Sequence, residues 1–259
     1  MTLVKESDTS VWCELTYTDL NTGGPAVDHV KAALSAGKHV VTSNKGPAAL
    51  FYPEMKKLAD ANHCKFMIEG TVVAGTPVIN LADGPLAGCT ISKIRGILNG
   101  TTNYMLTEME KGMAYDEVLK IAQEKGYAEA DPTGDVEGYD ARGKVTILAN
   151  IVMNAGIKIT DVPCQGITKI SPADIAKAKT ENKRWKLIGS MEMKEGKIIT
   201  SVKPEMIDIG HPLAGVSGAT NALTFSTDLL GDVTIVGPGA GKIETGFAIL
   251  TDLLAIHRG

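Results

Sequence analysis

The sequence "VWCELTYTDLNTGGPAVDHVKAALSAGKHVVTSNK" at residues 11–45 contains two short apolar stretches on either side of a helical one. Pro25 is typical of a first helical turn, and Gly37 is typical of the position that follows a helix. A strand, a helix and a second strand of these lengths predict a right-handed parallel unit. Ligands of parallel sheets bind where strands end and loops begin, so Thr16 and Lys45 lie at the expected ligand edge.

The rest of the chain continues in helical and strand-like stretches. A helix over residues 47–61 and a strand over residues 65–70 complete the parallel region, and beyond them the pattern changes to an α+β arrangement. We expect further helices at 101–112, 115–126, 135–154, 171–183 and 240–256, and strands at 91–98, 185–193, 197–204, 221–228 and 232–237.

The composition and charge of the chain exclude several classes of protein. Its 259 residues are 44% hydrophobic and 22% charged, which is typical of one or two folded domains. The net charge is −4 without any basic run, so nucleic acid is not an expected partner. No stretch approaches the ~18 apolar residues of a membrane span, and the first residues lack the pattern of an export signal. We therefore expect a cytoplasmic protein without a membrane partner.

Cysteine and histidine positions indicate neither a disulfide framework nor a zinc site. The cysteines lie far apart without a CxxC pair, which favours buried free thiols in a reducing cytosol. The histidines are also scattered, and ordinary surface or core roles are the favoured interpretation for them. The residues concerned are Cys13, Cys64, Cys89, Cys164, His29, His39, His63, His211 and His257.

The segment "GYAEADPTGDVEGYDARGKVTILANIVMNAG" at residues 126–156 contains the candidate chemistry. A turn at residues 131–134 precedes Asp135, a natural N-cap for the helix that follows. On that helix Lys144 falls in the middle of the apolar face, one turn from Asp140. The opposite, solvent-facing side is expected to carry Arg142, Thr146, Asn150 and Met153.

Two interpretations of Asp140 and Lys144 follow from this spacing. A surface pair four residues apart on a helix contributes only ~0.2–0.5 kcal/mol to stability. A lysine on an apolar face must instead pair with a carboxylate or line a cavity, because burying an unpartnered ammonium is costly. Such a lysine beside an acid suits proton transfer to a substrate oxygen.

Several stretches resemble the hallmark sequences of homoserine dehydrogenases, in the family order and nearly from end to end. They are "VVTSNKGPAAL" (40–50), "EGTVVAGTPVI" (69–79), "GILNGTTNYMLTEM" (96–109), "GYAEADPTGDVEGYDARGKVTIL" (126–148) and "GPGAGKIETGFAILTDL" (237–253). The resemblance implies the reversible reduction of L-aspartate 4-semialdehyde to L-homoserine by NADP or NAD, on the route to threonine, methionine and isoleucine.

The resemblance also implies roles for particular residues. Lys144 would be catalytic, delivering a proton to the aldehyde oxygen as hydride reaches the carbonyl carbon. Lys45 would neighbour cofactor and substrate, where a fixed cation favours developing alkoxide charge, and a solvated loop lysine is the alternative. Glu129 and Asp140 would bind the amino group of the substrate, with Asp135 supporting them.

A monovalent-cation loop, typically for sodium, is implied at residues 69–77. Its ligands would be carbonyl oxygens and one acidic side chain, at Glu69, Val72, Ala74 and Thr76. An ordinary strand-to-helix turn is the alternative interpretation of this loop.

Cofactor binding is implied for Thr16, Lys45, Gly126 and Gly241, and simple turn geometry is the alternative for the glycines. The "GPGAGK" segment around Gly241 is not a Walker loop, because too few residues separate its glycines and Ile243 stands where Ser or Thr is required.

Family members begin with a strand and a GxGxxG loop for the cofactor's pyrophosphate, and this chain has no such motif before residue 11. We therefore expect a partial Rossmann-type nucleotide-binding domain at residues 1–66 and 231–259, with an uncovered sheet edge and apolar helix surfaces. An α+β catalytic and dimerisation domain is expected at residues 67–230, in a homodimer or higher homo-oligomer. A catalytically inactive remnant that acts as a dimerising or interaction module is the alternative function.

Overall fold

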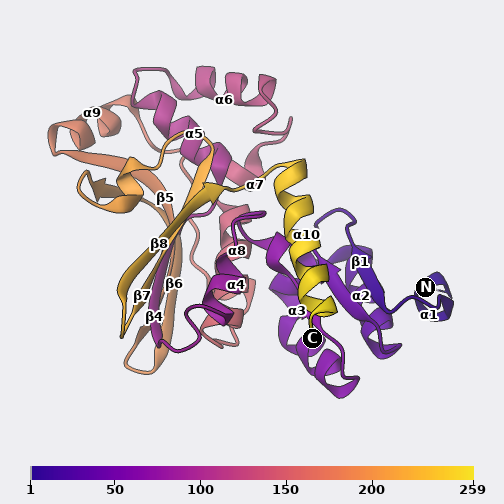
Figure 1. Ribbon diagram of the computed structural model, residues 1–259. Coiled ribbons are helices and arrows are strands. Elements are labelled where there is room, and N and C mark those ends of the chain that lie inside the picture. Colours follow the sequence, from indigo (N-terminus) through magenta and orange to yellow (C-terminus); the bar gives the residue numbers. More distant parts are fainter. Residues whose placement is uncertain (1) are drawn as a thin grey trace. The chain divides into compact units, whose positions relative to one another are not determined.

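The computed structural model describes residues 2–259, which divide into two compact units. Unit 1 consists of the chain up to Leu86 together with Thr146–Ile159 and Ala240–Gly259, and unit 2 consists of Ala87–Val145 and Thr160–Gly239. One unit contains a parallel sheet and the other an antiparallel sheet, so the expected α/β fold class is confirmed (Figure 1).

Unit 1 is built on a parallel sheet with the strand order β1-β2-β3. The predicted strand–helix–strand unit is present, because α2 joins β1 to β2, and Val40 and Val41 in the middle strand are fully buried. The elements are α1 (Thr2–Glu6), β1 (Val11–Glu14), α2 (Gly24–Ser35), β2 (His39–Thr42), α3 (Lys45–Ala61), β3 (Phe66–Met67), the 3-10 helix η1 (Glu69–Thr71), α4 (Val78–Asp83) and α10 (Lys242–His257), which lies against β2 and η1.

Unit 2 is built on a five-stranded antiparallel sheet with the order β6-β5-β4-β7-β8. Glu195 and Gly196 connect β5 to β6, and both have positive φ, as the commonest two-residue hairpin turn requires. α5 packs against β5 and β7. The elements are β4 (Ile91–Ile97), α5 (Gly100–Met109), α6 (Tyr115–Glu124), α7 (Thr133–Val136), α9 (Pro172–Thr180), β5 (Lys183–Lys194), β6 (Lys197–Asp208), η3 (Pro212–Gly215), β7 (Thr220–Thr227) and β8 (Gly231–Pro238).

The remaining elements, α8 (Tyr139–Val152) and η2 (Ile159–Asp161), include residues of both units. The units differ from the expected domain boundaries at residues 66–67 and 230–231. β8 pairs with β7 along its whole length and therefore belongs to the antiparallel sheet. The segment after β3 belongs to unit 1, where the Glu69 amide donates to Asp252 Oδ2 of α10 at 3.1 Å.

The helix expected over residues 135–154 is two helices, α7 and α8. Gly138 lies between them with a φ of 82°, a left-handed conformation that interrupts the helical path. Asp135 consequently lies within α7, and Pro132 precedes that helix. The expected N-cap role of Asp135 is wrong for this reason.

The solvent face expected for α8 is also wrong. Thr146 and Asn150 were assigned to that face, yet they are only 0% and 6% exposed. Asn150 can be buried because its amide is satisfied within the chain: Nδ2 donates to the Ile157 carbonyl at 2.9 Å, and Oδ1 accepts from the Ile157 amide at 2.8 Å. Helical periodicity alone does not reveal such a partner.

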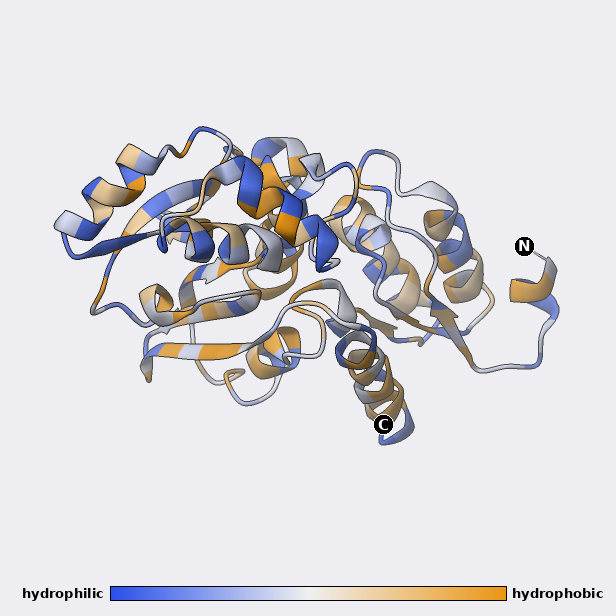
Figure 2. Ribbon diagram, turned by 90° about the horizontal axis from the view of Figure 1, so that it is seen from above, coloured by the Kyte–Doolittle hydropathy of each residue, from blue (hydrophilic) through white to orange (hydrophobic). Residues whose placement is uncertain are grey.

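The uncovered surfaces expected in unit 1 are present. β1 is an edge strand of the parallel sheet. Many residues of α10, the helix that leads to the C-terminus, are hydrophobic (Figure 2), and those that are exposed recur at helical spacing. Contiguous exposed apolar surface of this kind is typical of an interaction site. These exposed apolar residues of α10 are Ile243, Phe247, Leu250 and Leu254.

The cysteines are free, but not all of them are buried as expected. Cys64 is buried and Cys13 is exposed, with Cys89 and Cys164 between these extremes. Within residues 2–259 no helix combines the length and apolar character needed to cross a membrane. The same residues contain no group of three or more His, Cys, Asp or Glu side chains that could hold a metal ion.

A buried lysine ties α5 to the sheet of unit 2. Lys186 in β5 is 1% exposed, and its Nζ donates to Asn103 Oδ1 at 3.0 Å and to the Val216 carbonyl at 2.6 Å. The Asn103 amide also donates to the carbonyls of Gly218 and Thr220. Burial disfavours the charged form and lowers the pKa of Lys186 to about 8.

We predict that this lysine makes stability depend on pH. The unfolded chain binds more protons at Lys186 than the folded chain between the folded pKa of about 8 and the ordinary value of 10.5, so stability rises with pH over this window. Relative to Lys186→Met, the free energy of unfolding of the wild type should increase by roughly 2 kcal/mol between about pH 7.5 and about pH 10. Urea denaturation measures this difference. An unchanged difference would contradict the low pKa, and Lys183→Met is the control at a partly exposed lysine of the same strand.

Candidate active site

Lys144 is a buried lysine with two fixed partners. It is 7% exposed, and its Nζ lies 2.7 Å from Asp140 Oδ2 and donates to the Leu98 carbonyl at 2.6 Å. This burial rules out the interpretation of Asp140 and Lys144 as a solvated surface pair. An ammonium group has three donors, so one proton of Lys144 is uncommitted among the described residues.

Asn99 connects the acids around Lys144. Its Nδ2 donates to Asp135 Oδ1 at 2.6 Å and to Asp140 Oδ2 at 3.1 Å. Its Oδ1 accepts from the Thr102 amide at 2.9 Å, so Asn99 is also the N-cap of α5. The Asn99 side chain thereby connects three helices: α5 through the Thr102 amide, α7 through Asp135 and α8 through Asp140. Asn99 is not among the predicted site residues, although an asparagine just before the predicted helix at 101–112 is a recognisable N-cap signal.

The electrostatics of this cluster favour a cation. Burial raises the pKa of Asp135, and the nearby Asp140 carboxylate raises it further, while the Asn99 and Thr101 hydrogen bonds and the Lys144 charge act in the opposite direction. Two carboxyl groups therefore face one fixed ammonium. Such a site can accept a further positive group, such as a substrate amine.

Two other predicted residues of unit 2 lie in the segment between α6 and α7. Glu129 is exposed, and its backbone carbonyl accepts from Gln123 Nε2 at 3.1 Å. Among residues 2–259 its side chain takes no part in the Lys144 network. Gly126 has a φ of 73° just after α6, so helix-ending geometry by itself explains this glycine.

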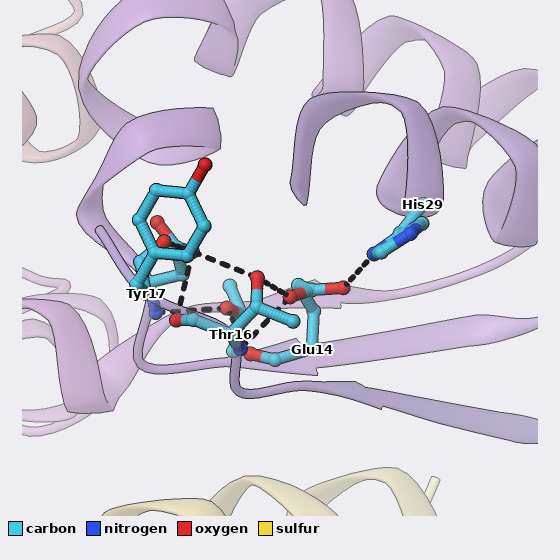
Figure 3. A network of polar contacts seen from close by, with 6 residues as sticks. Glu14, Thr16, Tyr17 and His29 are labelled. Carbon is cyan, nitrogen blue, oxygen red and sulfur yellow. Dashed lines mark hydrogen bonds and ion pairs between the residues drawn. The ribbon is translucent and has the colours of Figure 1, made fainter. Parts of the chain in front are cut away.

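Thr16 and Lys45 lie at the carboxyl ends of β1 and β2, as expected. The Thr16 amide and hydroxyl both donate to the Glu14 carboxylate (Figure 3). Lys45 is the first residue of α3, and its amide lies 3.4 Å from Thr18 Oγ1. Glu14 is not among the predicted site residues, because its contact with His29 forms only when α2 packs beside β1.

Gly241 precedes α10 with a φ of 140°. A Cβ added at this position would lie 1.8 Å from Glu244 Oε2, so any larger residue would displace that carboxylate. Turn geometry and close packing therefore explain the glycine without reference to a ligand, and cofactor binding at Gly241 stays a prediction.

The loop after β3 contains a buried acid and an unusual backbone. Glu69 is buried, and its carboxylate accepts from the amides of Ile79 at 3.1 Å and Asn80 at 2.7 Å. Val73 and Ala74 have φ values of 57° and 48°, which are uncommon for residues with a Cβ and are a genuine outlier for a branched valine. Strained backbone of this kind concentrates at functional sites.

Comparison with known sequences relates these residues to one enzyme family. The family model described as homoserine dehydrogenase matches residues 77–254. The NAD(+)-dependent homoserine dehydrogenase of Pseudomonas canavaninivorans is 49% identical over 257 residues, which are 99% of this chain and 73% of that protein. A homoserine dehydrogenase of Methanocaldococcus jannaschii is 46% identical over 256 residues, covering 98% of this chain and 75% of that protein.

Solved structures give the same result. A putative homoserine dehydrogenase from Archaeoglobus fulgidus superposes with a TM-score of 0.91 at 40% identity, covering 100% of this chain and 78% of that one. A hyperthermophilic archaeal homoserine dehydrogenase in complex with NADPH superposes with a TM-score of 0.83 at 33% identity, covering 99% of this chain and 74% of that one.

We predict that Asn99 is needed for the stability of the acidic cluster. Asn99→Asp keeps a capping acceptor for α5, because Asp and Asn cap about equally, but it removes the amide that joins Asp135 and Asp140. The free energy of unfolding at neutral pH should fall by roughly 2 kcal/mol through lost hydrogen bonds and repulsion among carboxylates. Urea denaturation measures the change.

Asn182→Asp is the control for this substitution, at an exposed position, and should change stability by less than ~0.5 kcal/mol. Equal stability of Asn99→Asp and the wild type would show that Asn99 does not hold the acids in place.

Proposed function

The chain belongs to the homoserine dehydrogenase family, and on this premise we propose that it interconverts L-homoserine and L-aspartate 4-semialdehyde through Lys144. The observation that carries the proposal is the buried ammonium of Lys144, which two fixed acceptors hold in place while one proton stays uncommitted. Nothing in the comparisons favours the alternative of an inactive dimerising remnant.

Lys144 acts as the general acid in the direction of aldehyde reduction. Its uncommitted proton passes to the carbonyl oxygen as the carbon is reduced, and in the reverse direction Lys144 receives the hydroxyl proton of homoserine. The nicotinamide cofactor, when bound, supplies or accepts the hydride. Asp140 and the Leu98 carbonyl keep Nζ in one position, so proton transfer needs little reorganisation.

Asp140 and Asp135 bind the amino group of the substrate. They carry more negative charge than Lys144 neutralises, and Asn99 fixes both of them. We assign the same role to Glu129, whose exposed carboxyl group is available in the segment before α7. Paired carboxylates at a fixed distance suit the recognition of an ammonium group.

Thr16, Lys45, Gly126 and Gly241 form the proposed set of cofactor-binding residues. The first two fit this role because they lie at the carboxyl ends of parallel strands, where such ligands bind. The Lys45 cation additionally favours an alkoxide that develops on the substrate. Among the relatives, one is described as NAD(+)-dependent and another is in complex with NADPH, so the proposal includes either cofactor.

We also propose that the loop after β3 binds a monovalent cation, with sodium as the favoured ion. The ligands would be the Glu69 carboxylate together with Val72, Ala74 and Thr76. Two observations support this: Glu69 is a buried acid that a cation would compensate, and Ala74 holds a strained left-handed conformation. Hard cations prefer oxygen ligands, which this loop offers as carbonyls.

A homodimer or higher homo-oligomer completes the proposal. Exposed apolar side chains on three strands of unit 2 support association, namely Met193 on β5, Ile199 on the edge strand β6 and Val236 on the edge strand β8. We place the enzyme in the cytoplasm, because a reducing compartment suits its free cysteines.

We predict that the purified 259-residue chain reduces NAD or NADP in a homoserine-dependent reaction. Lys144→Ala should lower kcat at least ~100-fold, because a general acid contributes this much or more, while cofactor affinity stays unchanged. Steady-state absorbance assays measure kcat, and fluorescence titration with the reduced cofactor measures affinity.

Lys56→Ala provides the matched control, at an exposed lysine that pairs with Asp60 on α3, and should retain wild-type activity. Near wild-type turnover by Lys144→Ala would reject the role of that lysine. A wild-type chain without homoserine-dependent turnover would contradict the proposed function.

We predict that turnover rises when sodium replaces choline at constant ionic strength. Glu69→Gln removes the anionic ligand and should raise the half-saturating sodium concentration at least ~10-fold. Asp83→Asn is the control, at an exposed acid that ends the neighbouring helix α4. A wild-type rate that is independent of sodium would contradict the proposed ion site.

A further inference from the structure

Glu14 is a buried carboxylate at the end of β1. It is 1% exposed, and Oε1 accepts from both the amide of Thr16, at 3.0 Å, and the Thr16 hydroxyl. Oε2 lies 2.7 Å from Nδ1 of His29 on α2. Figure 3 shows the carboxylate between Thr16 on one side and the imidazole on the other. A strand, a helix and the loop after the strand therefore meet at one side chain.

The carboxylate of Glu14 is held in its ionised form. Burial raises its pKa, but the hydrogen bonds from Thr16 and the contact with His29 outweigh this effect and lower the pKa below its usual value. An ionised carboxylate is an acceptor only. Both Thr16 groups and the imidazole must therefore donate to it.

A second side chain holds the same loop from the other strand. Asn44 Nδ2 donates to the carbonyls of Thr16, at 3.1 Å, and Tyr17, at 2.8 Å, while Asn44 Oδ1 accepts from the Gly46 amide and caps α3. The Thr42 hydroxyl also donates to the Glu14 carbonyl at 2.6 Å. The loop after β1 is thus fixed through backbone and side-chain groups at the ends of two strands.

The commitment of the Thr16 hydroxyl proton determines what this residue can bind. Because the proton is directed at Glu14 and Asn44 Nδ2 donates to the oxygen over 3.5 Å, Thr16 Oγ1 offers its remaining lone pair, and no donor, to a ligand. Its counterpart must be a hydrogen-bond donor, such as a ribose hydroxyl or a carboxamide N–H of a dinucleotide. A phosphate group would meet an acceptor beside a buried carboxylate and would be repelled.

We propose that Glu14 and His29 are positioning residues for the dinucleotide, acting through Thr16 to present an obligate acceptor to a ribose hydroxyl or carboxamide donor. This inference rests on the proposed function, in which Thr16 contacts the cofactor. Neither Glu14 nor His29 needs to touch the cofactor. Their effect is to fix the direction of one hydroxyl and the path of one loop.

The first experiment tests, without any ligand, whether Glu14 holds the loop that carries Thr16. Amide hydrogen exchange, followed by NMR, is compared among the wild type, Glu14→Gln and Asp60→Asn, whose exposed acid lies on α3. Glu14→Gln should speed exchange at the Thr16 amide at least ~10-fold, because a charged acceptor is replaced by a weaker neutral one. The control should leave this rate unchanged. An unchanged Thr16 rate in Glu14→Gln would overturn the proposal.

The second experiment tests the consequence for the cofactor. Glu14→Gln and His29→Leu should raise the KM for the dinucleotide at least ~5-fold, with kcat and the KM for homoserine within ~2-fold of wild type. His29→Gln keeps a neutral N–H donor toward Glu14 and should lie between wild type and His29→Leu.

A fall in kcat without a rise in the cofactor KM, or equal KM increases for both substrates, would overturn the positioning role. Failure of the proposed function is distinguishable from failure of this inference. A wild-type chain without turnover rejects the function, whereas the exchange rate of the Thr16 amide still decides whether Glu14 holds the loop.

Discussion

The burial of one ammonium group constrains the part of the candidate active site that lies in unit 2. Lys144 has acceptors from two separate places, Asp140 on its own helix and the Leu98 carbonyl at the end of β4. A buried charge that loses a partner is strongly destabilising, so strand end and helix must keep their relative positions. Asn99 extends this requirement to α5 and α7. The geometry of the candidate site around Lys144 and the local stability of unit 2 thus depend on the same few bonds.

In unit 1, hydrogen bonds at strand ends fix the candidate residues Thr16 and Lys45. Polar groups at the carboxyl ends of β1 and β2 form hydrogen bonds with one another there. Glu14 and Asn44 hold the loop that carries Thr16, and Asn44 at the same time starts the helix that carries Lys45. Loops are ordinarily the mobile part of a parallel sheet. Here the hydrogen bonds at the ends of β1 and β2 also hold the loop after β1 in place, at the sheet edge where a ligand is expected to bind.

Periodic features were predictable from the sequence, and contacts between distant segments were not. The parallel strands and the apolar environment of Lys144 follow from spacing alone, which is why both were identified before the structure. The break between α7 and α8 depends on the left-handed conformation of Gly138, and the sequence of a helical stretch does not indicate which φ a glycine adopts. Asn99 bonds to Asp135 and Asp140, which lie far away in the chain, and the partners of Glu14 are Thr16 and a histidine on the following helix that no sequence spacing singles out. Family resemblance supplied the roles of Glu129 and Glu69, which no local pattern indicates.

The buried Lys186 supports the candidate cluster around Lys144 from outside it. It anchors Asn103, which lies one helical turn beyond Asn99 on α5. Asn103 and Asn99 thus tie the same helix to two places, the sheet through Lys186 and the carboxylates of Asp135 and Asp140. Engineering of this protein should therefore include Asn103 and Lys186 among the positions that affect activity, and directed evolution of altered activity can be expected to yield variants at these two residues.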